Sequence, residues 1–138
     1  MSTKFQFFTI FLFLLGFNLK AQSHTSPLQR EWMLISFKEY KKDFLVQAKA
    51  SLKFETLKSA HAKMGCNTLN FTVNTIKNKK IIFGEGISTM MYCEDYMTLE
   101  KDFSTSLMEV CKYQIKGHFL TLSDKKGRQM KFVAADWD

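Results

Sequence analysis

Alternation of apolar and polar residues over short segments is the feature that most constrains how this chain folds. Apolar side chains occupy every second position from 46 to 54 and again from 69 to 73. A period of two residues is typical of β-strands that bury one face. Further short apolar segments lie at 31–37, 60–64, 80–83, 113–115, 118–122 and 130–132. The sequence therefore predicts a mainly β (α+β) fold of antiparallel strands. Between them we predict a loop or single helical turn at 38–44, and turns at 55–56, 74–80, 84–86, 116–117 and 124–127.

One segment has the period of a helix instead. Its apolar side chains recur at steps of three and four residues, at Tyr96, Leu99, Phe103, Leu107 and Val110. Glu94 and Asp95 are predicted to lie in the first turn of this helix, where carboxylates favour the positive helix end. An apolar stripe must be covered by another element. We therefore expect a small antiparallel barrel-like or half-barrel sheet of about six to eight strands, with the helix packed on it or closing one end.

The N-terminal residues have the pattern of an export signal. Lys4 precedes a mostly apolar run of 13 residues at 5–17, which is shorter than the roughly 20 residues of a membrane-spanning helix. Residues 21–23 (AQS) follow in a polar stretch and offer small side chains to a signal peptidase. We predict that residues 1–22 are a signal peptide cleaved after one of these three residues; an uncleaved anchor is the alternative. The first cysteine is Cys66, so the expected product is secreted or periplasmic, not lipid-anchored, and without a transmembrane span.

Charge limits the expected partners. Removing residues 1–22 leaves 18 basic and 13 acidic residues, a net charge of +5. An exported protein rarely meets nucleic acid, so anionic envelope polymers or lipid headgroups are the expected contacts of a basic surface. Basic clusters at 41–42, 77–80 and 125–128 lie in or beside predicted turns, and we interpret them mainly as solvated turn residues.

Four motifs resemble a known family in their order along the chain: WML at 32–34, GCN at 65–67, STMMYC at 88–93 and FLTL at 119–122. With the helix that follows the third motif, they resemble the META domain, the family of HslJ-like heat-inducible envelope proteins. The resemblance places a META-like domain at residues 28–135. It implies a compact antiparallel barrel with a helix, an envelope-associated role linked to stress or antibiotics, and no established catalytic residues. The family usually carries Arg or Lys where Met90 stands, Ala where Tyr92 stands, and often Gly where Phe71 stands.

The most specific motif positions are Gly65, Asn67, Ser88, Thr89 and Met91, beside Cys66 and Cys93. We interpret Asn67 and Thr89 as local hydrogen-bonding residues at tight turns. Because both cysteines are motif positions and the expected compartment is oxidising, we predict a structural disulfide between them. A redox or metal pair is the alternative, although a spacing of 27 residues fits neither a CxxC motif nor a zinc knuckle.

Cys111 lies outside the family pattern, and we expect it to close the helix as a small apolar residue. A nucleophile and base formed by Cys111 and His118 is the catalytic alternative, but no third orienting group accompanies them. His24, His61 and His118 do not share a metal-ligand spacing. The sequence therefore predicts a protein that is not an enzyme and holds no metal or cofactor.

Two functions fit these observations. The first is a non-enzymatic envelope accessory or interaction role for a monomer, with an envelope protein or an anionic envelope component as partner and without nucleic acid. The second is a small apolar-ligand-binding module that uses a barrel cavity. Aromatic and methionine side chains would line that cavity unless they form the core: Phe71, Met90, Met91, Tyr92 and Met97.

Overall fold

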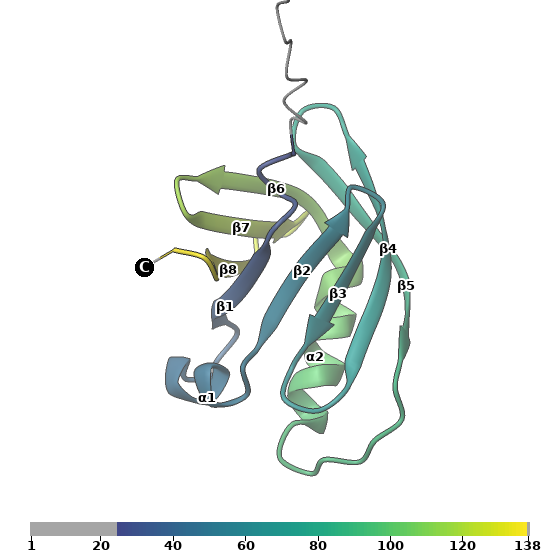
Figure 1. The fold of residues 1–138 in the computed structure, drawn as a ribbon, viewed down its shortest axis with the longest axis vertical. Coiled ribbons are helices and arrows are strands. Elements are labelled where there is room, and N and C mark those ends of the chain that lie inside the picture. Colours follow the sequence, from purple (N-terminus) through teal and green to yellow (C-terminus); the bar gives the residue numbers. More distant parts are fainter. Residues whose placement is uncertain (1–24, 138) are drawn as a thin grey trace, which may run out of the picture.

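Eight antiparallel strands follow one another around a closed barrel in the computed structural model, which describes residues 25–137 (Figure 1). Each strand pairs with the next along the chain, and the last pairs with the first. The strands are β1 (Glu31–Phe37), β2 (Ser51–Thr56), β3 (Ser59–Lys63), β4 (Thr68–Ile76), β5 (Lys80–Ser88), β6 (Val110–Lys116), β7 (Phe119–Asp124) and β8 (Gln129–Ala134). The predicted mainly β barrel is confirmed. The predicted signal peptide lies outside the described residues.

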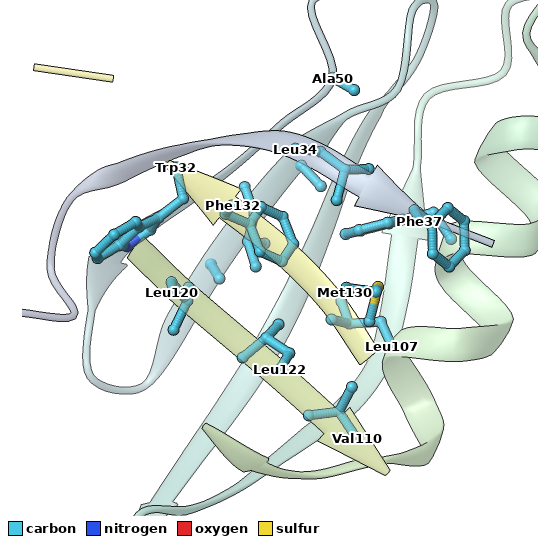
Figure 2. Packing of buried hydrophobic residues seen from close by; sticks show 14 of the residues in the cluster. Trp32, Leu34, Phe37, Ala50, Leu107, Val110, Leu120, Leu122, Met130 and Phe132 are labelled. Carbon is cyan, nitrogen blue, oxygen red and sulfur yellow. The ribbon is translucent and has the colours of Figure 1, made fainter. Parts of the chain in front are cut away.

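Inward-facing side chains from neighbouring strands fill the barrel. Leu34 of β1 is directly opposite Phe132 of β8, which in turn is opposite Leu120 of β7, and all three are buried. Trp32 is also buried, and its indole N–H donates a hydrogen bond of 3.1 Å to the carbonyl of Leu28. Figure 2 shows these core side chains gathered between the strands. Because they alternate with outward-facing residues, the period-two pattern of the sequence places one face of each strand in the core.

The helix α2 (Met97–Glu109) covers the place where the barrel is weakly closed. β5 and β6 pair at Lys80 and Lys112, and beyond Lys80 the described residues of β5 have no strand partner on that side. α2 connects these two strands, lies beside β5 and runs behind β2 and β3 in Figure 1. Its buried face carries Leu99, Phe103 and Leu107, as the helical stripe predicts.

The start of α2 differs from the prediction. Glu94 and Asp95 precede the helix, because the backbone N–H groups of Tyr96 and Met97 both donate to the carbonyl of Cys93 in a turn. The carboxylate in the first turn of the helix is Glu100 instead. Glu100 is buried, so its role is not the solvent-exposed helix-end stabilisation that the sequence suggested for its neighbours.

The predicted strand at 46–54 is wrong in its first half. Residues 42–47 form the helix α1 (Lys42–Gln47), which overlaps the loop or single helical turn predicted at 38–44, and the strand begins at Ser51. Leu45 and Ala48 are buried three residues apart while Val46 is exposed, which is the helical pattern. Lys49, with a φ of 49°, then turns the chain into β2.

Gly84 and Gly86 do not end a strand as predicted, because β5 continues through both to Ser88. A Cβ on Gly84 would lie 2.1 Å from Oγ1 of Thr72, and one on Gly86 would lie 2.5 Å from the ring of Phe71. Glycine within a strand commonly marks such a close approach. The predicted turn at 74–80 is also shorter, since β4 continues to residue 76.

Candidate functional site

Two of the sequence motifs meet where the chain crosses from β5 to α2. Residues 89–96 form this crossing, the long loop at the bottom of Figure 1, and we call them the crossing segment. A disulfide joins Cys66, which follows β3, to Cys93 in the crossing segment, with the two Cα atoms 6.0 Å apart. The predicted disulfide is confirmed, and it ties the crossing segment to the barrel.

Asn67 holds the crossing segment through every hydrogen-bonding position of its buried side chain. Its Oδ1 accepts from the backbone N–H of Met91 and from the hydroxyl of Thr89, each at 2.8 Å. Its Nδ2 donates to the carbonyl of Met91 and to Oε2 of Glu100, each at 2.9 Å. An amide side chain offers two acceptor and two donor positions, and all four are used here.

The interpretation of Asn67 and Thr89 as local hydrogen-bonding residues is therefore wrong. The partners of Asn67 lie between 22 and 33 positions away along the chain. The hydroxyl of Thr89 also accepts a hydrogen bond of 3.1 Å from the backbone N–H of Thr68. Among these motif residues, Ser88 makes a local hydrogen bond, because its hydroxyl donates to the carbonyl of the next residue, Thr89, at 2.7 Å.

Glu100 is the residue of this site that the sequence analysis missed. Its Oε1 accepts from the backbone N–H groups of Cys66 and Asn67, and its Oε2 accepts from the side chain of Asn67. Hydrogen bonds to a carboxylate are stronger than neutral ones, and they compensate for burial of its charge. Glu100 lies four residues after Tyr96 and three before Phe103, on the apolar stripe of α2. A charged residue on an otherwise apolar stripe is the sequence feature that could have identified Glu100 as part of a site.

Gly65 and Tyr96 close the other side of the site. The φ of Gly65 is 107°, and a Cβ there would lie 2.3 Å from Cγ of Tyr96, so only glycine leaves room for the ring. Tyr96 packs against Phe44 of α1, with the ring centroids 5.7 Å apart, and Phe44 stacks on Tyr40 at 5.9 Å. The hydroxyl of Tyr40 donates to Asp102 at 2.9 Å. Burial and then this hydrogen bond raise the pKa of Tyr40 to about 12.

An exposed apolar surface lies above this support. The exposed fractions are 94% for Met90, 57% for Met91, 79% for Tyr92 and 37% for Met97, so these side chains are not the core that the sequence suggested. Phe71, in contrast, is a buried core residue.

A hollow of about 400 Å³ separates the crossing segment from α2, and a second one of about 330 Å³ adjoins it beside β5. The two hollows share the side chains of Leu69, Ser88 and Ser104. We call them together the methionine groove, because all the exposed methionines of the described chain line it: Met90, Met91, Met97 and Met108.

The alternative catalytic residues are far from one another. Cys111 is half-buried near the start of β6 and does not close the helix, which ends at Glu109. His118 lies in the turn after β6 and stacks on Trp137, with the ring centroids 4.8 Å apart. Seven residues of extended chain span roughly 20 Å, so Cys111 and His118 do not form a nucleophile and base. His61 faces Glu55 on the outside of the barrel, with Nδ1 and Oε1 separated by 3.5 Å.

Among residues 25–137, no group of three or more His, Cys, Asp or Glu side chains is placed to hold a metal ion. No helix in the same part of the chain is long and apolar enough to span a bilayer.

The META domain, a known protein family, matches residues 26–137 of this chain. The chain belongs to the META domain family. A crystal structure of a DUF4847 family protein from Bacteroides vulgatus is similar, with a TM-score of 0.58, 11% identity, and coverage of 80% of this chain and 96% of that one. An NMR structure of a protein from Burkholderia xenovorans has a TM-score of 0.60, 18% identity, and coverage of 79% and 83%. At these identities the likeness concerns the fold alone. No curated protein matches the chain.

The motif residues of this META domain are thus mainly structural. Gly65, Asn67, Thr89 and the disulfide fix the crossing segment, and Met91 contributes its backbone to the same network. Met90 and Tyr92, where this chain departs from the usual family residues, are the most exposed large apolar side chains of the segment. The family pattern therefore builds a support, and this chain presents methionine and tyrosine on top of it.

Proposed function

We propose that the protein is a non-enzymatic, exported accessory protein of the cell envelope whose methionine groove binds an apolar segment of an envelope partner. One observation carries the proposal: the exposed methionines gather on one surface, beside the exposed side chain of Tyr92. Contiguous exposed apolar patches commonly mark interaction sites. Methionine suits such a surface because its unbranched side chain adapts to the shape of a partner.

The support under the groove favours the same role. The crossing segment is fixed by the disulfide and by the four hydrogen bonds of the Asn67 side chain. A binding surface that is ordered before binding loses less conformational entropy when its partner arrives. The proposal therefore assigns the motif residues to preorganisation and the methionines to contact.

Export and the lack of catalysis rest on separate observations. The pattern at residues 1–22 and the disulfide both fit an oxidising compartment, where disulfides persist. The hydrogen bonds that Glu100 accepts come from this chain's own backbone and side chains, which suits a structural carboxylate. The exposed lysines at 41–42, 77 and 79–80 give the surface a positive charge that would attract anionic envelope components.

Site-specific photo-crosslinking tests the proposal. A photoreactive residue would replace Met90 or Tyr92 in the full chain, and Val46 of α1, which is 56% exposed, provides the control position. We expect the same envelope protein to be captured at both groove positions and not at Val46. Purified wild-type domain should compete for capture, and the variant carrying Met90→Ser and Met97→Ser should not. Equal capture at all three positions, or none in the groove, would contradict the proposal.

A small apolar ligand is the second candidate, because a hollow of about 530 Å³ lies at one end of the barrel. Its floor includes the buried side chains of Phe37, Val110 and Met130. Three of the four charged residues at its rim form ion pairs, Lys38 with Asp102 and Arg128 with Asp124, and Glu39 is the fourth. This pairing favours a neutral ligand.

Methyl-selective NMR of methionine distinguishes the two sites. Titration with neutral lipids or detergents below micelle formation should shift the methyl signal of Met130 if the barrel end is the ligand site. Shifts confined to Met90 and Met97 would assign apolar binding to the groove instead. No shift at any methionine would remove the ligand candidate.

A further inference from the structure

Three methionines line the same hollow of the methionine groove. Met90 and Met91 come from the crossing segment, Met97 is the first residue of α2, and all three line the volume of about 400 Å³. The backbone of Met91 is fixed at both its N–H and its carbonyl by Asn67. Methionine has three rotatable side-chain bonds, so the three sulfur atoms are free to close on a common ligand.

The charged side chains at this hollow are one carboxylate, Glu100, and one ammonium group, Lys101. Glu100 lines the hollow from below, and its oxygens already accept hydrogen bonds from Cys66 and Asn67. It therefore contributes negative charge near the methionines without being free to ligate. Lys101, which also lines the hollow, carries the opposing positive charge on a long side chain.

We propose that Met90, Met91 and Met97 bind one soft monovalent cation, Cu(I) or Ag(I), through their thioether sulfur atoms. Thioethers select soft ions, whereas zinc, calcium and magnesium need imidazole, thiolate or oxygen ligands. The two neighbouring cysteines are joined in a disulfide and are not available as thiolates. The site thus differs from the groove's proposed role in protein binding, although it uses the same side chains.

Silver titration tests the site. Cys111 is the free cysteine of the described chain and would bind silver itself, so the experiment uses the mature protein with Cys111→Ser. Silver nitrate is added in chloride-free buffer, and binding is followed by native mass spectrometry and by methionine-methyl NMR. We expect one Ag(I) per chain and shifted methyl signals for Met90, Met91 and Met97. Zinc added in the same way should shift none of them.

Leucine variants show whether the sulfur atoms are the ligands. Met97→Leu should weaken silver binding about tenfold or more, and replacement of all three methionines by leucine should abolish it. Met33→Leu in β1 is the matched control, since Met33 lies outside the groove. Silver binding that persists in the triple leucine variant, or wild-type protein without bound silver, would overturn the proposal.

The same variants keep this inference separate from the proposed function. Leucine preserves the apolar surface but removes the sulfur, so the triple leucine variant should lose silver while partner capture at Tyr92 continues. Serine removes both properties. Loss of partner capture in the serine variant, but not in the triple leucine variant, would support the proposed function. The silver titration decides the metal site independently of that result.

Discussion

Asn67 contacts both oxygens of the Glu100 carboxylate, one through its backbone N–H and the other through its side-chain amide. This contact joins the loop between β3 and β4 to the first turn of α2. The remaining positions of the Asn67 amide hold Thr89 and Met91 of the crossing segment. One buried side chain, together with the disulfide, therefore holds the helix and the methionine groove against the barrel.

Replacing Asn67 by alanine should lower the free energy of unfolding by about 2–4 kcal/mol, because buried partners lose their hydrogen bonds. Urea denaturation measures this change. Asn70→Ala on β4 is the control, since Asn70 is exposed and should change stability by less than about 0.5 kcal/mol. Equal effects of the two substitutions would contradict the role given to Asn67.

The disulfide should also stabilise the barrel strongly. Cys66 and Cys93 enclose a separation of 27 residues, for which the chain-entropy relation gives roughly 3–4 kcal/mol. Reduction, or the variant carrying Cys66→Ser and Cys93→Ser, should lower the melting temperature by more than about 10 °C. Reduction of the double serine variant is the control and should have no further effect. An unchanged melting temperature in reduced wild-type protein would refute this prediction.

Local periodicity was enough to predict most of the fold. The alternation of Leu69, Phe71 and Val73 and the stripe of Leu99, Phe103 and Leu107 identified β4 and α2, because large apolar side chains recur with only one period in each segment. The pattern failed at 46–50. Small alanines there fit a helix as well as a strand, so burial could not be assigned from the sequence.

The candidate site depended on tertiary structure and was predicted only in part. The disulfide came from family motif positions, whereas the role of Asn67 required the crossing segment and α2 to be placed around it. Gly86 was interpreted as part of a turn. Its actual role is to leave room for Phe71 on the neighbouring strand, and that contact follows only from the register of β4 and β5. Met90 and Met91 lie in a segment without periodicity, and so their exposure was not predictable.

Gly65 should tolerate no side chain. Gly65→Ala brings a Cβ against the ring of Tyr96 at a φ of 107°, and should cost about 2–4 kcal/mol of stability. Gly117→Ala is the matched control, since Gly117 also has a positive φ but no atom within 4 Å of an added Cβ. It should cost only about 1 kcal/mol. Chemical denaturation compares them, and the claim fails if Gly117→Ala proves the more destabilising.

Tyr40 should make stability fall at high pH. Its pKa is raised from 10.0 to about 12, mainly by burial and then by its hydrogen bond to Asp102. Below pH 10 the residue is protonated in both states and contributes no pH dependence. Between pH 10 and 12 the unfolded chain releases this proton while the folded chain keeps it, so the free energy of unfolding declines. Denaturation of wild type and Tyr40→Phe across this range should show a shallower decline in the variant. Identical slopes would refute the shift.

Amide hydrogen exchange at Met91 tests most directly whether Asn67 holds the methionine groove in place. The N–H of Met91 donates to Oδ1 of Asn67 at 2.8 Å, in a segment whose side chains are largely exposed. Protection of this amide therefore reports the contact itself. We predict slow exchange at Met91 in wild-type protein and fast exchange in Asn67→Ala, while the amides of β7 and β8 remain protected in both. Fast exchange at Met91 in wild-type protein, or slow exchange in Asn67→Ala, would contradict the account.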